Sequence, residues 1–232
     1  MSGFLVVTAI SVGTTLAAFA LARAHRERLS GSMLAPGLAA GVMLWLALVE
    51  VAPDSAATMG WMATVLAMTG GAALVWLSSR LAHRTTVAAG VAPVVGVALV
   101  LHDLPEGFAV GALLTSTGLI AALPVVVAIA AHNLPEKLAF VAPAEGERLS
   151  TRTVLLAATL PEPLGAALAG VGAAAAPGTV SLAVATAGGM MLAVAVGALP
   201  TVARRASAWR PFLRAGAAGA MSMAALAVVL PG

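Results

Sequence analysis

Eight apolar runs, each about as long as a membrane-spanning helix, fill almost the whole of this 232-residue chain. A helix needs about 20 consecutive apolar residues to cross the hydrocarbon core of a bilayer. Runs of that length occupy residues 3–22, 32–52, 57–79, 87–112, 119–143, 152–172, 179–201 and 212–230. Because backbone polar groups within lipid need partners inside the same segment, each run predicts a helix. We therefore expect an all-α fold, a polytopic membrane helix bundle of eight transmembrane helices in a single domain, residues 1–232.

Composition excludes a soluble globular protein. Charged residues make up 9% of the chain and hydrophobic residues 61%, whereas the surface of a soluble domain needs far more charge. The runs consist mainly of Ala, Val, Leu and Gly, and the small residues among them let membrane helices approach closely. Without cysteine, the chain has no disulfide framework and no thiolate ligand for a metal.

All eleven arginines fall in alternate loops between the runs or within the first three residues of the run that follows. They follow the first, third, fifth and seventh runs, as Arg23, Arg26, Arg28, Arg80, Arg84, Arg148, Arg152, Arg204, Arg205, Arg210 and Arg214. Loops rich in Lys and Arg stay in the cytoplasm, so both termini are expected outside, in a multi-pass protein of the cell (inner or plasma) membrane. This topology also explains the basic pI, near 11.0, and we expect no nucleic-acid partner.

Two copies of one polar pattern interrupt the fourth and fifth runs, HDLPEG at 102–107 and HNLPEK at 132–137. In each copy a His precedes a Glu by four residues, so both side chains project from one face of a helix. This is the spacing of metal ligands. The Pro before each Glu lacks an N–H, which leaves the carbonyl of Leu101 or Ala131 able to face a cation.

The turn signal at residues 116–118 makes residues 87–143 an antiparallel helical hairpin. Glu106 lies twelve residues before Gly118, and His132 lies fourteen residues after it. At about 1.5 Å per residue, both lie roughly 20 Å from the turn. The Glu of one helix is therefore expected level with the His of the other. The residues that converge near mid-membrane are His102, Glu106, His132 and Glu136.

Further oxygen ligands lie close by in the predicted bundle. Asp103 and Asn133 are rotated by about 100° from their neighbouring His residues, so we expect them to face an adjacent site. Glu162, between two prolines that break the sixth helix, is expected at the same depth, either as a ligand or as a hydrogen-bonded tie between helices. Ionisable groups at this depth mark ion pathways by default. Glu50 and Asp54 either attract cations to an entrance or form a solvated helix end.

The ligand types narrow the choice of cation. Imidazole and carboxylate without thiolate suit zinc and other first-row divalent ions such as iron(II), cobalt and manganese, whereas dedicated magnesium and calcium sites prefer oxygen alone. A buried polar network that only ties helices together is the structural alternative. It would place four ionisable groups where apolar residues build a more stable bundle.

These features resemble the ZIP (Zrt-/Irt-like) divalent-metal transporters, in particular the bacterial zinc-uptake and GufA-like branch. The similarity extends over essentially the whole chain and is most specific in the paired HxxPE motifs and the PEPLGA tract that contains Glu162. The resemblance implies a two-metal transport site. It places one ion among His102, Glu106, His132 and Glu136. It places the second ion at Asp103, Asn133 and Glu162, with Glu106 and Glu136 bridging the two.

The family's behaviour implies that zinc, iron, manganese, cobalt or cadmium moves toward the cytoplasm through this mid-membrane binuclear site by alternating access. It also implies a homodimer in the lipid bilayer, without an organic cofactor. The first, fourth, fifth and sixth helices would then move against the second, third, seventh and eighth.

Three residues depart from the family's pattern. Asp103 replaces the usual Asn and adds a negative charge, and Gly197 stands where many relatives place an acidic exit-side ligand. Lys137 stands where close relatives have Gly, and this only lysine of the chain lies well inside a run. Two interpretations of Lys137 are open. Its ammonium replaces part of the second ion beside Glu136 or Glu162, or it snorkels toward the cytoplasmic end of its helix.

Two other functions would use the same side chains. An intramembrane metal-dependent hydrolase also places His and carboxylates in helices, but the zinc-protease pattern HExxH is absent, and two duplicated half-sites fit a transport path better than one catalytic centre. The second is a carrier of protons or of other cations, because imidazole exchanges protons near neutral pH. We expect a transporter rather than an enzyme.

Overall fold

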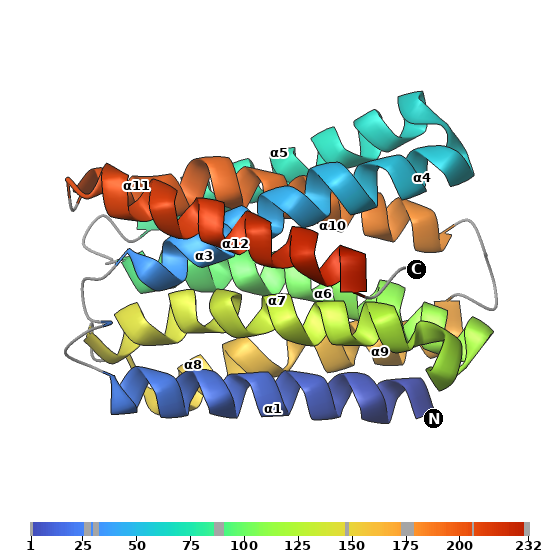
Figure 1. The fold of residues 1–232 in the computed structure, drawn as a ribbon, viewed down its shortest axis with the longest axis horizontal. Coiled ribbons are helices and arrows are strands. Elements are labelled where there is room, and N and C mark those ends of the chain that lie inside the picture. Colours follow the sequence, from blue (N-terminus) through green and yellow to red (C-terminus); the bar gives the residue numbers. More distant parts are fainter. Residues whose placement is uncertain are drawn as a thin grey trace.

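The computed structural model of the protein is a bundle of long helices (Figure 1). It describes residues 2–25, 29, 33–85, 91–146, 149–172, 179–205 and 207–229. Every regular element in these ranges is a helix, so the expected all-α class is confirmed for them. The elements in chain order are α1 (Ser2–Ala24), α3 (Leu34–Trp45), the π-helical turn η1 (Leu46–Val51), α4 (Ala52–Met59), α5 (Trp61–Thr85), α6 (Val91–Thr117), α7 (Leu119–Gly146), α8 (Thr151–Thr159), α9 (Pro161–Gly172), α10 (Thr179–Ala193), the π-helical turn η2 (Val194–Ala198), α11 (Leu199–Arg205) and α12 (Trp209–Val229).

Several of these helices continue into one another and form longer segments. The turn η1 joins α3 to α4, and η2 joins α10 to α11. Seven segments of the described chain are long and apolar enough to cross a membrane, which indicates a multi-pass membrane protein. They are Gly3–Ala24, Leu34–Met59, Trp61–Arg80, Val95–Thr115, Thr151–Gly170, Thr179–Gly197 and Trp209–Val229. The remaining expected span corresponds to α7, which has 28 residues. Its crossing of the membrane, and the total of eight spans, stay predictions.

The boundary between the second and third helices differs from the prediction. The sequence predicts an end near residue 52 and a new start near 57, whereas α4 continues to Met59 and α5 begins at Trp61. Pro53 is tolerated because η1 ends two residues before it, at Val51, and a wider turn leaves room for a residue without an N–H. Gly60 separates the two helices with a φ of 81°, which glycine adopts without steric cost.

Four helix pairs make the most extensive contacts in the bundle: α6 with α9, α3 with α12, α5 with α10, and α1 with α7. Glycines permit this approach. A Cβ added to Gly41 would overlap the backbone of Gly216, and one added to Gly107 would overlap the backbone of Glu162. Such close packing holds helices together in lipid, where the hydrophobic effect does not. The contact of α6 with α9 also fixes the backbone of Glu162 against α6.

These pairs fall within the two helix sets that the resemblance implies. One set contains α1, α6, α7 and α9, which share a buried apolar cluster of their own. Its members are Val7, Val110, Leu114, Ala122, Val126 and Ala166. The other set contains α3, α5, α10 and α12, and contacts of α10 with α6 and of α3 with α7 join the two. Movement of one set against the other stays a prediction.

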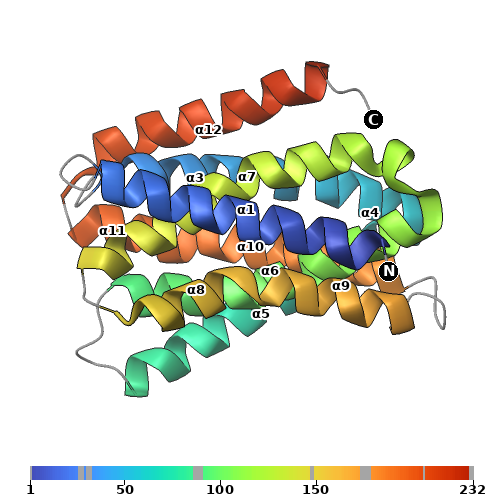
Figure 2. The ribbon, with the colours of Figure 1, turned by 90° about the horizontal axis from the view of Figure 1, so that it is seen from below.

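The two ends of the bundle differ in charge. At one end α1, α5 and α11 finish and α8 and α12 begin (Figures 1 and 2), and the described arginines lie in or near these helix ends. We call this the arginine end. The opposite end, here the turn end, carries the turns at Gly60 and Gly118 and the start of α1. The distribution agrees with the predicted topology, whose orientation in a membrane stays a prediction.

Candidate metal centre

Two His–Glu pairs connect α6 and α7 inside the bundle. His102 Nε2 lies 3.0 Å from Glu136 Oε2, and His132 Nε2 lies 2.9 Å from Glu106 Oε1. All four side chains are buried. The sequence predicts that the Glu of each helix lies level with the His of the other, and the structure confirms this cross-pairing.

Asp103 joins the first of these pairs, contrary to the prediction that it faces an adjacent site. Its Oδ1 lies 3.0 Å from His102 Nε2. Ligand atoms of His102, Asp103, Glu106 and Glu136 all lie within 4.8 Å of one another, so these four residues could hold one metal ion. A rotation of about 100° separates the Cβ directions of neighbouring helical residues, but rotation about the side-chain bonds brings their terminal atoms together here.

Four buried oxygens around these pairs have no hydrogen-bond donor among the described residues. They are Asp103 Oδ2, Glu106 Oε2, Asn133 Oδ1 and Glu136 Oε1. A buried acceptor without a partner is costly, and a carboxylate at membrane depth costs about 3 kcal/mol. One divalent cation would supply the missing partner to several of these oxygens at once. The donor set therefore fits a metal ion.

A break between α8 and α9, which together form the predicted sixth helix, brings Glu162 into the same region. As the sequence predicts, the prolines interrupt the helix: α8 ends at Thr159 and α9 begins at Pro161, and the two lie end to end (Figure 2). In contrast, Pro105 and Pro135 lie inside the continuous helices α6 and α7. That the carbonyls before them face a cation stays a prediction.

Glu162 contacts α7 through two donors. Its Oε1 accepts a hydrogen bond from Asn133 Nδ2 at 3.0 Å and lies 2.8 Å from Lys137 Nζ. All three side chains are buried. The structure thus shows the tie between helices that the sequence left as one alternative for Glu162. A role of Glu162 and Asn133 as metal ligands stays a prediction.

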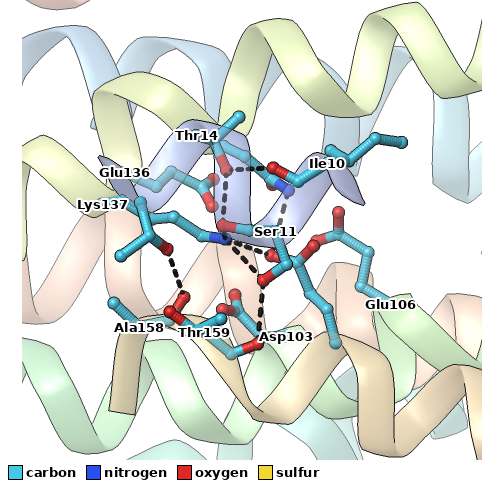
Figure 3. A network of polar contacts seen from close by, with 12 residues as sticks. Ile10, Ser11, Thr14, Asp103, Glu106, Glu136, Lys137, Ala158 and Thr159 are labelled. Atoms are coloured by element: carbon cyan, nitrogen blue, oxygen red, sulfur yellow. Dashed lines mark hydrogen bonds and ion pairs between the residues drawn. The ribbon is translucent and has the colours of Figure 1, made fainter. Parts of the chain in front are cut away.

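Lys137 does not snorkel toward the end of α7, so that interpretation is wrong. The residue has a relative exposure of 0%. Besides its ion pair with Glu162, Nζ donates to the hydroxyl of Ser11 at 2.9 Å and to the Ser11 carbonyl at 3.2 Å (Figure 3). Because three acceptors meet the ammonium inside the bundle, it has no need to reach the membrane surface.

Two hydroxyl residues of α1 belong to this network but do not appear in the sequence-based site. Ser11 Oγ donates to the Thr159 carbonyl at 2.9 Å, and Thr15 Oγ1 donates to the Ala158 carbonyl at 3.0 Å. Thr159 needs such a donor because the residue four positions on, Pro163, has no N–H. The available signal is the group of hydroxyl residues in the otherwise apolar first run.

A cavity of about 500 Å³ leads toward the metal centre from the turn end of the bundle. Its charged or titratable lining residues are Glu50, Asp54, Glu106 and His132, and most of the rest are apolar residues of α6, α10 and α12. Asp54 is exposed, whereas Glu106 and His132 are buried. Glu50 is half-buried and accepts a hydrogen bond from Trp45 Nε1 at 3.1 Å. The cavity therefore connects an exposed acidic residue with the buried centre.

Neither known protein families nor curated protein sequences gave a match to this chain. The geometry of the candidate metal centre, the cavity beside it and the apolar helices around both are therefore the features that indicate a function.

Proposed function

We propose that this protein is a divalent metal cation transporter of the ZIP type, which moves zinc or a related first-row ion toward the cytoplasm. The observation that carries the proposal is a buried His/Asp/Glu group that lies at the inner end of a cavity. Glu106 belongs to both, since it is a member of the group and lines the cavity.

The cavity favours a transported ion over a permanent structural one. A structural metal site is closed by protein ligands on all sides. In this protein an ion that enters past Asp54 can reach Glu106 and His132 through the cavity. Acidic residues along such a path raise the local concentration of cations, because low-dielectric walls focus the field of the charges.

The two helix sets supply a route to the opposite side. After binding, the ion has to leave toward the arginine end, and this requires α1, α6, α7 and α9 to shift against α3, α5, α10 and α12. Both metal-ligating helices belong to the first set, so the ion would travel with its ligands. Helices that slide in this way need small residues where the sets touch, and Ala and Gly are abundant in this chain.

Zinc uptake into proteoliposomes tests the proposal. Glu106→Gln and His102→Ala each remove one ligand and are expected to lower initial uptake by more than about tenfold. Even the loss of a residue that only hydrogen-bonds to a metal ligand typically lowers metal affinity by about 10–100-fold. Glu145→Gln is the matched control, because Glu145 is a carboxylate at the far end of α7 that forms an ion pair with the exposed Arg23.

Folding of each variant is checked by size-exclusion chromatography and circular dichroism before uptake is compared. Uptake by Glu106→Gln and His102→Ala at the rate of Glu145→Gln, with all three proteins folded, would contradict a transport route through this centre.

A further inference from the structure

We propose that the Lys137 ammonium is a resident cation that takes the place of a second metal ion, so that the centre holds one dication at a time. The inference rests on the proposed function, because it concerns how many of the transported ions the same centre binds at a time. The only lysine of the chain is fully buried in an ion pair with Glu162, inside the bundle rather than in a loop.

Lys137 and Glu162 form an ion pair. Nζ lies 2.8 Å from Glu162 Oε1, and the same oxygen also accepts from Asn133 Nδ2 at 3.0 Å. A zinc ion bound to this carboxylate would lie about 2.0–2.2 Å from its oxygen, directly beside the ammonium. Two cations at that separation repel strongly in a medium of low dielectric constant. The pair therefore keeps a second dication away from Glu162.

The ammonium is fixed between three helical segments, its own and the two that supply its acceptors. Lys137 comes from α7 and Glu162 from α9, and α1 contributes the hydroxyl and the carbonyl of Ser11 (Figure 3). An ammonium has three N–H donors, and these three acceptors match that number. The Ser11 hydroxyl is itself oriented by its hydrogen bond to the Thr159 carbonyl. The position of the charge is thus built into the fold.

The ligands other than Glu162 suffice for one ion. His102, Asp103, Glu106 and Glu136 offer four ligand atoms within 4.8 Å of one another, and Glu162 is not a member of this group. Four is the usual coordination number of zinc in proteins. One dication thus has three carboxylates and an imidazole, while Glu162 already has a cation of its own.

Zinc stoichiometry of the full-length protein in detergent tests the inference, with zinc as the probe in calorimetric titration and in elemental analysis. The wild-type protein is expected to bind one zinc ion per chain. Lys137→Met removes the charge and keeps a flexible side chain, so a second zinc ion is expected to bind beside Glu162. Lys137→Arg keeps a cation and is the matched control, with one zinc ion expected.

Lys137→Met loses every hydrogen-bond donor of the lysine and could therefore fail to fold. Lys137→Gln serves as a second neutral variant, because its amide can still donate to Glu162 and Ser11. Two zinc ions in the wild-type protein would overturn the inference, as would one zinc ion in the folded neutral variants. Zinc uptake by a wild-type protein with two bound ions would overturn the inference and leave the proposed function intact. A protein that neither binds nor transports zinc would remove both.

Discussion

Gly165 lies where α9 comes closest to the turn of α6 that carries Glu106, and its replacement by alanine should disturb the metal centre from outside. A Cβ at Gly165 would lie 2.6 Å from Phe108 N and closer still to the Leu104 carbonyl. Ordinary van der Waals contact begins at 3.4 Å. To lengthen the distance between this Cβ and Phe108 N from 2.6 Å to 3.4 Å, the two helices must separate by at least about 0.8 Å. Backbone atoms cannot give way as the end of a flexible side chain does.

This separation is large compared with what metal coordination tolerates. Ligand distances in metal sites hold to within about 0.2 Å, so a shift of the turn that carries Glu106 places its carboxylate out of reach. We expect Gly165→Ala to weaken zinc affinity by about 10–100-fold, the typical effect of removing a residue that hydrogen-bonds to a metal ligand. Overpacking of this kind also destabilises a protein by about 1–3 kcal/mol.

Gly170→Ala is the matched control, because Gly170 lies on the same helix and an added Cβ there meets nothing within 4 Å. Both variants are compared for zinc affinity by calorimetry, for initial uptake in proteoliposomes and for thermal unfolding in detergent. Equal zinc affinity for Gly165→Ala and Gly170→Ala would refute the reasoning, since it would mean that the α6–α9 contact does not position the ligands.

Two further predictions concern α1 and the cavity. Thr15→Val removes the hydrogen bond to the Ala158 carbonyl and should lower the free energy of unfolding by about 1 kcal/mol. Thr8→Val, whose hydroxyl bonds within its own helix at an exposed position, should have almost no effect, and equal unfolding of the two variants in denaturant would contradict the role of Thr15. Asp54→Asn at the outer part of the cavity should slow zinc uptake roughly twofold to tenfold at low ionic strength, with an unchanged maximal rate. A rate equal to that of Glu145→Gln, measured at low zinc, would exclude electrostatic attraction by Asp54.

The helices could be predicted from the sequence because the information that defines them is local. Length and apolar character of each run specify a membrane-crossing helix without reference to the rest of the chain. The errors lie at helix boundaries, as at Pro53, where a π-helical turn allowed the second helix to continue to Met59. A proline normally predicts an end, and only the local geometry shows that it was accommodated.

The cross-pairing of the His and Glu residues could also be predicted, because one turn at Gly118 and the rise of a helix fix the levels of both motifs. Spacing along the chain does not fix which way each side chain turns. Asp103 therefore joined the group around His102, although its position on the helix pointed to a neighbouring site.

Only the tertiary structure decided the environment of Lys137 and the partners of the broken sixth helix. Ser11 lies 126 residues from Lys137 and 148 residues from Thr159 in the chain, and no local pattern relates residues so far apart. The same holds for the cavity, which forms between side chains of five helical segments. The sequence by itself determined that this chain forms apolar helices with two His–Glu motifs inside them. The packing of those helices determined which charges meet, because burial and contact depend on neighbours that come from distant parts of the chain.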